Sequence, residues 1–258
     1  MRELVTGLQL PEALRSEGDG LYFSDAAAGG VYRWTEDGVA TVIPKRRGVG
    51  GLALHADGGV VVTGRTLIHV RHGQTRELFA PEGALGLNDL TTDAEGRVLV
   101  GTLRMNWREP EAGLPGEIWR IGSEGKQLLV EGIQYPNGMA FSPDNGTLYI
   151  SDFVGSCVHA VDVETWTRQV FATLEKGNAD GLAVDASGRV WVATGDADSF
   201  DIFSPEGKLV DRVTPPERFA VTLCFGAQDP HDLYLAAGGS IFHTRSEIPG
   251  LAAGPARV

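Results

Sequence analysis

A short apolar motif recurs along the whole chain and constrains its fold more than any other feature. Each copy is a run of β-type residues such as Leu148-Tyr149-Ile150-Ser151, preceded by a polar turn with glycine such as Pro143-Asp144-Asn145-Gly146. The six runs end at residues 24, 63, 101, 151, 193 and 236, so they are spaced by 39, 38, 50, 42 and 43 residues. Repeats of about 40–50 residues with several strands each are typical of β-propellers.

Four strands can be assigned to each repeat. An apolar strand such as Gly181-Leu182-Ala183-Val184 precedes the turn, and two weaker strands follow the motif, as in residues 158–161 and 169–172. No helical period is sustained over ten residues, so the crossover helices of an α/β fold are not expected. The sequence therefore predicts an all-β, six-bladed propeller that occupies residues 1–258 as one domain. The segment Glu3-Leu4-Val5 should complete the last blade, because ring closure removes exposed sheet edges.

The amino-acid composition limits the classes of partner and indicates the cellular compartment. The 35 glycines are about twice the average usage, which fits many tight turns. With 22 basic and 34 acidic residues the net charge is −12, which argues against nucleic acid or an anionic membrane as the main partner. The start of the chain lacks a signal-peptide pattern, and no apolar run approaches 18 residues. Two cysteines, Cys157 and Cys224, are too few for a disulfide framework, so we expect a cytoplasmic protein, and a monomer because a propeller closes on itself.

The sixfold register also singles out one position in each repeat. Residues just before the innermost strands should face the central axis, and counting back about thirteen residues from each motif finds them. They are Glu12, Gly50, Asn88, Asn137, Asp180 and Leu223. Two carboxylates and two amides around one axis favour a hard divalent cation, with Ca²⁺ preferred and Mg²⁺, Mn²⁺ or Zn²⁺ as alternatives. The alternative role for these residues is to cap strands or bind channel water.

Several segments around these positions resemble a known family. They are Glu12 with residues 21–25, Asn88-Asp89 with residues 93–97, Pro136-Asn137-Gly138 with residues 148–152, and residues 180–193. Together they are similar to the senescence marker protein/gluconolactonase (regucalcin-like) family. The resemblance implies a metal-dependent lactonase or related ester hydrolase. It also implies that Glu12, Asn137 and Asp180 are metal ligands and that Asn88 contacts substrate or metal-bound water.

The chain departs from that family at three places. Glu12 is followed by Ala13-Leu14-Arg15-Ser16 rather than by the usual Gly/Ser-Pro-x-Trp, an expected arginine is Gly86, and a frequent Thr-Asn pair is Thr222-Leu223. These changes remove polar contacts suited to a sugar lactone. We therefore expect a more apolar lactone or acyl substrate.

The remaining site residues are predicted from the chemistry that a metal-dependent hydrolase requires. Asp180 is the best candidate for a general base, because a carboxylate that binds a metal through one oxygen leaves the other free. The longest loop, residues 103–116, should cover the substrate with Arg104 and Trp107, although an ordinary surface loop is an equal alternative. No Gly-x-Ser-x-Gly motif supports a serine nucleophile. A cyclase, isomerase or phosphotriester hydrolase with the same metal, or a non-catalytic binding propeller, remain alternatives.

Overall fold

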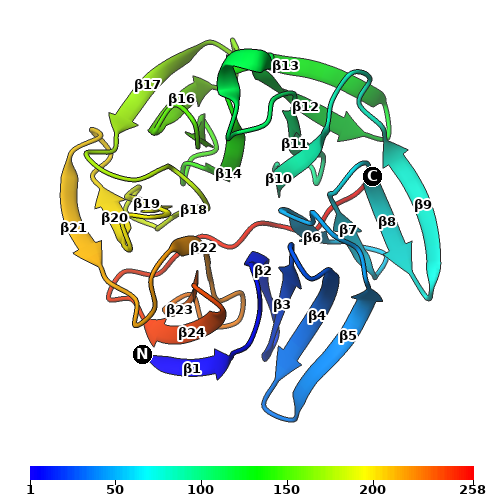
Figure 1. The fold of residues 1–258 in the computed structure, drawn as a ribbon, viewed down its shortest axis with the longest axis vertical. Coiled ribbons are helices and arrows are strands. Elements are labelled where there is room, and N and C mark those ends of the chain that lie inside the picture. The colour runs from blue at the N-terminus through cyan, green and yellow to red at the C-terminus, as the bar shows by residue number, and fades with distance from the viewer.

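The computed structural model describes residues 1–258, and six four-stranded antiparallel sheets arranged around a centre form the predicted β-propeller (Figure 1). Blade 1 contains β2 (Pro11–Glu17), β3 (Gly20–Asp25), β4 (Gly30–Thr35) and β5 (Gly38–Pro44). Blade 2 contains β6 (Leu52–Leu54), β7 (Val60–Val62), β8 (Leu67–Arg71) and β9 (Gln74–Phe79). Blade 3 contains β10 (Gly86–Thr92), β11 (Val98–Leu103), β12 (Gly116–Gly122) and β13 (Gly125–Ile133).

The second half of the ring repeats this pattern. Blade 4 contains β14 (Pro136–Phe141), β15 (Thr147–Asp152), β16 (Cys157–Asp162) and β17 (Arg168–Thr173). Blade 5 contains β18 (Leu182–Val184), β19 (Val190–Ala193), β20 (Phe200–Phe203) and β21 (Leu209–Val213). Blade 6 contains β22 (Ala220–Phe225), β23 (Asp232–Ala237), β24 (Ser240–Arg245) and the N-terminal β1 (Arg2–Val5). The helical content is one short 3₁₀ turn, Pro110–Ala112, and no helix is long and apolar enough to cross a membrane.

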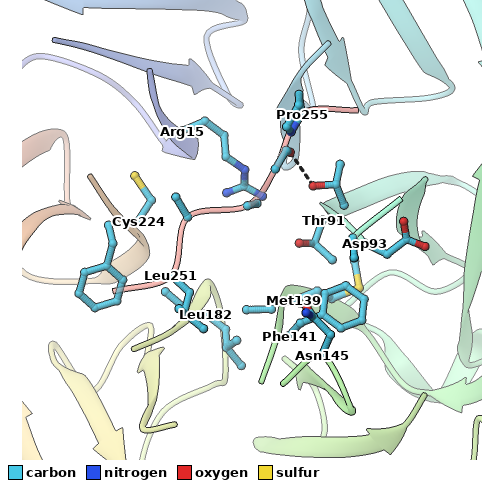
Figure 2. A pocket seen from close by; sticks show the side chains of 18 of the residues that line it. Arg15, Thr91, Asp93, Met139, Phe141, Asn145, Leu182, Cys224, Leu251 and Pro255 are labelled. Atoms are coloured by element: carbon cyan, nitrogen blue, oxygen red, sulfur yellow. Dashed lines mark hydrogen bonds between the residues drawn. The ribbon is translucent and has the colours of Figure 1, made fainter. Parts of the chain in front are cut away.

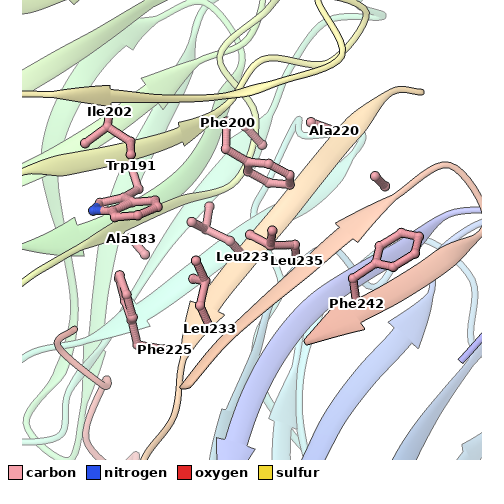
Figure 3. Close-up of a cluster of buried hydrophobic side chains, with 12 residues drawn as sticks. Ala183, Trp191, Phe200, Ile202, Ala220, Leu223, Phe225, Leu233, Leu235 and Phe242 are labelled. Atoms are coloured by element: carbon pink, nitrogen blue, oxygen red, sulfur yellow. The ribbon is translucent and has the colours of Figure 1, made fainter. Parts of the chain in front are cut away.

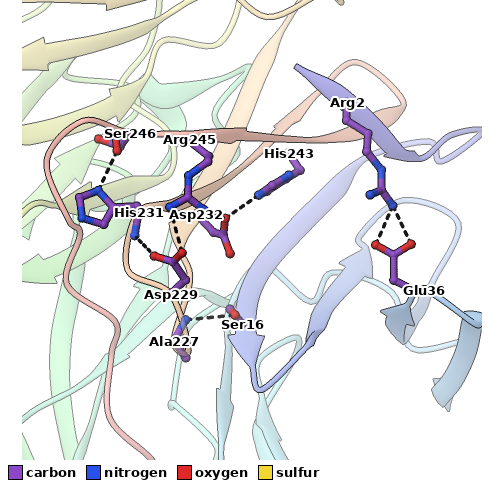
Figure 4. Close-up of polar contacts among 10 residues, drawn as sticks. All are labelled: Arg2, Ser16, Glu36, Ala227, Asp229, His231, Asp232, His243, Arg245 and Ser246. Carbon is purple, nitrogen blue, oxygen red and sulfur yellow. Dashed lines mark hydrogen bonds and ion pairs between the residues drawn. The ribbon is translucent and has the colours of Figure 1, made fainter.

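The N-terminal strand closes the ring as the sequence predicts. β1 pairs antiparallel with β24, so blade 6 takes its outer strand from the opposite end of the chain. Arg2 of this strand also donates two 2.8 Å hydrogen bonds to Glu36 in blade 1, and the Ala227 N–H of blade 6 donates to Ser16 Oγ of blade 1 (Figure 4). Blades 6 and 1 are therefore joined by backbone pairing and by side chains.

The hydrophobic core is divided among the gaps between blades. Each of the six buried clusters combines residues of two neighbouring blades. Between blades 5 and 6, for example, Phe200 and Trp191 lie against Leu223, Phe225 and Leu235 (Figure 3). The alternation of apolar residues along each strand places one face of a blade against the next, which makes the ring the unit that buries apolar surface.

The hairpins between the first two strands of each blade are made by the polar-glycine turns. In blade 2, Gly58 and Gly59 have φ of 93° and 80°, and the His55 N–H closes the turn on Gly59 O at 3.1 Å. Two successive positive φ values match the right-handed twist of the flanking strands and favour glycine. The turns thus hold the innermost strands in register.

The two ends of the ring differ in what lies across them. The first residues of the innermost strands gather at one end, called here the site end. At the other end, called the tail end, the segment 249–258 crosses from blade 5 to blade 2 (Figure 1). It pairs with Val184 through Leu251 N–H and with Leu54 and Ala56 through Ala256.

Candidate functional site

The innermost strands start irregularly, and this irregularity takes several of the predicted axial residues out of the regular ladder. Pairing shifts register after Glu12 in β2, after Leu87 in β10 and after Pro136 in β14. Each shift leaves residues outside the ladder, as β-bulges do, and re-aims their side chains. In β2 the bulge includes Ala13 at φ 57°, a left-handed conformation that is uncommon for alanine. The chain therefore accepts local strain directly beside Glu12.

Close contacts bring the axial residues of neighbouring blades together. The Asn88 side chain donates to Pro136 O at 3.0 Å, and the Gly138 N–H donates to Asp180 O at 3.2 Å. Asn137 lies close enough to Asp180 to stabilise the charged form of that carboxyl. Gly50 makes room for this arrangement, since a Cβ at its position would lie 2.4 Å from Asn88 Oδ1.

Two of the gathered groups are buried carboxylates of like charge. Glu12 and Asp180 are both nearly inaccessible, and Asp180 is 4 % exposed. Burial is the main cause that raises the pKa of both carboxyls. The charge of Asp180 raises the pKa of Glu12 further, and that of Asp89 raises both. Asp180 Oδ1 has no hydrogen-bond partner at all. An orphaned, buried carboxylate oxygen beside a second carboxylate lacks the compensation that buried charges normally require.

These residues fit a bound divalent cation. Glu12, Asn137 and Asp180 offer two carboxylates and an amide carbonyl, which are ligand types that hard cations prefer. A cation would neutralise both negative charges and supply the partner that Asp180 Oδ1 lacks. The donor set therefore suits the metal that the family resemblance implies.

A third carboxylate, Asp89, lies next to the axial set and was not singled out by the sequence analysis. Burial raises its pKa to about 6, against the opposing charge of Arg15. Arg15 Nη2 lies 4.0 Å from Asp89 Oδ1 and donates to Leu90 O at 2.7 Å. The adjacency of Asp89 to Asn88 was the available signal, but strand alternation gave no reason to place both near the axis. The bulge in β10 supplies that reason.

Arg15 also borders a cavity of about 360 Å³ on the tail side of the axial set. Met139, Phe141, Leu182 and the segment 251–255 line it as well, and Figure 2 shows Arg15 pointing into it. The cavity contains none of Glu12, Asn88, Asn137 or Asp180 among its lining residues. It therefore belongs to the tail end and not to the carboxylate cluster.

An aromatic cluster of Trp107, Phe153 and Tyr135 extends from the longest loop toward the carboxylates. Trp107 meets Phe153 edge-to-face at 5.7 Å between ring centroids, and Phe153 lies 5.9 Å from Tyr135. Burial, followed by the charges of Asp180 and Glu12, raises the pKa of Tyr135 to about 12. Trp107 is 42 % exposed, and Arg108 lies over its ring at 4.4 Å. The loop thus contacts the residues near the carboxylates through an edge-to-face pair and a tilted pair of rings.

The other loop residue predicted to contact substrate has a different position. Arg104 forms an ion pair with Glu117 at the start of β12, and Glu117 also accepts the Trp119 indole N–H at 2.8 Å. These contacts hold Arg104 within blade 3. Arg104 was predicted together with Trp107 to contact substrate, but it is not part of the aromatic cluster.

The sequence register was wrong in the last blade. Leu223 is 1 % exposed and packs in the core between blades 5 and 6 (Figure 3). Val221 occupies the position equivalent to Asp180, because the Gly181 N–H donates to Val221 O at 2.9 Å just as Gly138 donates to Asp180. The hairpin that follows β22 is longer than its equivalents: seven residues lie between the paired Phe225 and Leu233, against five between Val184 and Val190 in blade 5, so a fixed offset of thirteen residues fails there.

The architecture and the axial donor set define a class: a six-bladed propeller with an oxygen-rich cluster at the start of its innermost strands. Comparison with known proteins identifies the family within that class. Residues 10–239 match the family described as the SMP-30/gluconolactonase/LRE-like region, and the chain belongs to this family.

Two curated relatives agree with this assignment, and a solved structure shares the fold. A 6-deoxy-6-sulfogluconolactonase from Pseudomonas putida is 30 % identical over 90 % of this chain and 89 % of its own length. The pentonolactonase XacC from Haloferax volcanii is 26 % identical over 85 % of this chain and 77 % of its own. A regucalcin from Agrobacterium tumefaciens, described as a calcium-binding protein, has a TM-score of 0.86 at 21 % identity, with 100 % of this chain and 97 % of that chain covered. The two lactonases support lactone hydrolysis by an enzyme, and the regucalcin shows the shared fold.

Proposed function

We propose that the chain is a divalent-metal-dependent lactonase with its reaction centre at Glu12, Asn137 and Asp180. The observation that carries this proposal is the unpartnered Asp180 Oδ1 beside a second buried carboxylate. Such an arrangement is costly for folding and useful for holding a cation. The names of the relatives, both sugar lactonases, support the reaction class.

Each residue has a defined part in the proposed reaction. Glu12, Asn137 and Asp180 hold the cation, with Ca²⁺ as the favoured ion. When bound, the cation would polarise the lactone carbonyl and offset negative charge on its oxygen. Asp180 accepts a proton from the attacking water, whose oxygen adds to the carbonyl carbon. The ring C–O bond then breaks, and the alkoxide that leaves takes up a proton to give the hydroxy acid.

The neighbouring groups favour a substrate with an apolar portion. Trp107, Phe153 and Tyr135 offer aromatic surface next to the carboxylates, and Gly86 and Val221 add no polar group. Asn88 supplies an amide for the ring oxygen or a hydroxyl of the substrate. Burying an apolar substituent on this aromatic cluster contributes about 25 cal/mol per Å².

Metal removal combined with a lactone panel tests the proposal. The protein is stripped with a chelator and assayed with and without Ca²⁺, Mg²⁺, Mn²⁺ or Zn²⁺ on aldonolactones and on alkyl- or aryl-substituted lactones. We expect turnover that disappears on stripping, returns with Ca²⁺, and is fastest on the substituted lactones. The variant Trp107→Ala should raise KM for those lactones with little effect on kcat, because the ring binds substrate before and during reaction alike.

Three results would contradict parts of this proposal. Full turnover in the stripped protein would show that the reaction needs no metal. Faster turnover of aldonolactones than of substituted lactones would contradict the predicted preference for an apolar substrate. The absence of both metal binding and ester hydrolysis would favour a non-catalytic propeller.

A further inference from the structure

Blade 4 contains a second cluster of ligand-type side chains, formed by Asp152, Cys157 and His159. Asp152 ends β15, and Cys157 and His159 lie two residues apart on β16, so their side chains share one face of that strand. The exposed fractions are 3 %, 8 % and 4 %. His159 Nε2 lies 3.4 Å from Asp152 Oδ2 and 3.7 Å from Cys157 Sγ, and the three ligand atoms all lie within 4.8 Å of one another.

Blade 1 shows that the fold itself needs only the aspartate. The segments 21–25 and 148–152 share the pattern Leu-Tyr-x-Ser-Asp, and Asp25 accepts the Gln9 and Leu10 N–H groups. Asp152 accepts the Gln134 and Tyr135 N–H groups in the same way. The pairings Ser24–Val31 and Ser151–Val158 place Gly30 and Tyr32 where blade 4 has Cys157 and His159. The thiol and the imidazole are therefore additions to a structural cap that works without them.

The distances in the cluster approach those of a tetrahedral metal centre. Zinc bonds of about 2.3 Å to sulfur and about 2.0–2.2 Å to nitrogen or oxygen give ligand–ligand edges of about 3.3–3.6 Å. The observed separations of 3.4 and 3.7 Å differ from these edges by a few tenths of an ångström. Asp152 Oδ2 accepts one backbone N–H, from Gln134, and keeps a second lone pair for a metal.

We propose that Asp152, Cys157 and His159 form a second metal site, distinct from the axial carboxylates, that takes Zn²⁺ or a similar borderline divalent ion through one oxygen, one sulfur and one nitrogen. The thiol loses its proton on binding, and the thiolate together with the carboxylate neutralises the double positive charge. His159 binds through Nε2, so its ring proton resides on Nδ1, which has no protein partner. Water completes the coordination.

The loop beside the ligands connects this cluster to the aromatic cluster. Residues 153–156, between β15 and β16, are half-buried and lie directly beside the three ligands. Phe153 of this loop packs against Tyr135 and Trp107 of the aromatic cluster. An ion held by Asp152 and Cys157 would fix both ends of the loop and with it the position of Phe153.

Cobalt substitution tests this proposal by a signal specific to sulfur. Co²⁺ is added to chelator-stripped protein, and the near-ultraviolet thiolate-to-cobalt charge-transfer band is followed. We expect the band in the wild type, its loss on addition of Zn²⁺, and its loss in Cys157→Ser and His159→Gln. The matched control is Cys224→Ser, since Cys224 is also buried but lies outside the cluster, and this variant should keep the band. Asp180→Asn should keep it as well, because the axial ligands contain no sulfur.

The readouts separate this site from the proposed reaction centre. A wild type without the band, a band that survives in Cys157→Ser, or a band that disappears in Cys224→Ser would overturn the second site. None of these outcomes bears on the lactonase assay. Far-ultraviolet circular dichroism of Cys157→Ser and His159→Gln establishes that they are folded, and if either has lost its strand signal, the decisive readout is protection of Cys157 from alkylation by Zn²⁺ in the wild type. Equal alkylation rates with and without Zn²⁺ would overturn the proposal.

Discussion

Asp180 and Asp185 flank the same short strand, β18, and differ in almost everything except burial. They are 4 % and 0 % exposed. Asp185, at the tail end, accepts hydrogen bonds from the backbone N–H groups of Ser187 and Arg189 and from the side chains of Ser187, Arg189 and Trp191. Asp180, at the site end, has an oxygen with no partner.

The pKa shifts of the two carboxyls have opposite signs for that reason. Burial raises the pKa of Asp185, but its hydrogen bonds outweigh burial and the net pKa lies below the ordinary value. For Asp180, burial and the charge of Asp89 raise the pKa well above the ordinary value of an aspartate. A buried carboxylate with all its hydrogen bonds made stabilises a fold, whereas one with an unpaired oxygen is available to bind a ligand.

Blade 3 repeats the contrast along β10. Asp93, just after the strand at the tail end, binds the Glu95 and Arg97 N–H groups and the Arg97 side chain. Asp89, near the start of the strand, has its pKa raised to about 6 by burial. The same contrast between an axial carboxylate and a hairpin carboxylate is therefore found in two blades.

The largest predicted effect is on Asp180→Asn. Loss of the general base and of one ligand charge should lower kcat/KM on the preferred lactone by about 10²–10⁴-fold. The metal-free variant should be at least as stable as metal-free wild type, because one of two like buried charges is gone. Steady-state kinetics and thermal unfolding with and without Ca²⁺ measure both. Unchanged turnover together with unchanged Ca²⁺ affinity would refute the role of Asp180.

Asp185→Asn should have the opposite pattern of effects: a loss of stability with little change in activity. Weakening the charged hydrogen bonds of a buried group costs about 1.5–3 kcal/mol of the free energy of unfolding, while kcat/KM of the folded protein stays within about twofold. Because the folded-state pKa of Asp185 is depressed, its contribution is present above the ordinary value of 3.8 and is lost as pH falls through the folded-state pKa. Denaturant unfolding at several pH values should show the gap between wild type and variant narrowing below about pH 4. A gap that widens in acid, or an activity loss as large as that of Asp180→Asn, would break the contrast between the two ends.

The sequence predicted the propeller and most of the axial set because both depend on period. Apolar runs at regular spacing report strands, and equal offsets report equivalent positions, so Glu12, Asn88, Asn137 and Asp180 were found together. The offset failed at Leu223, since the hairpin between β22 and β23 is longer than that between β18 and β19. A fixed spacing does not account for hairpins of different length.

Contacts between distant segments also could not be predicted from the sequence. Phe153 contacts Trp107 across 46 positions of the chain, and Arg104 pairs with Glu117 of the following strand, so the two loop residues predicted to contact substrate have different partners. The cluster of Asp152, Cys157 and His159 joins two strands through a hairpin, and no spacing pattern in the sequence groups these three residues. These contacts depend on how the side chains pack, and the period of the repeat carries no information about that packing.

The smallest predicted effect concerns the segment 249–258 that crosses the tail end. Thr92 Oγ1 donates to Gly254 O at 2.7 Å, next to the cavity of about 360 Å³. Thr92→Val keeps the side-chain shape and should cost about 1 kcal/mol, or a Tm lower by about 2–4 °C. Proteolysis at 252–254 should become faster, while kcat/KM stays unchanged because the site end is not touched. The matched control is Thr91→Val, a neighbouring buried threonine with no bond to the segment, which should leave the proteolysis rate as in wild type. A fall in kcat/KM for Thr92→Val would show that the tail end is coupled to the carboxylate cluster, with Arg15 as the residue that borders both.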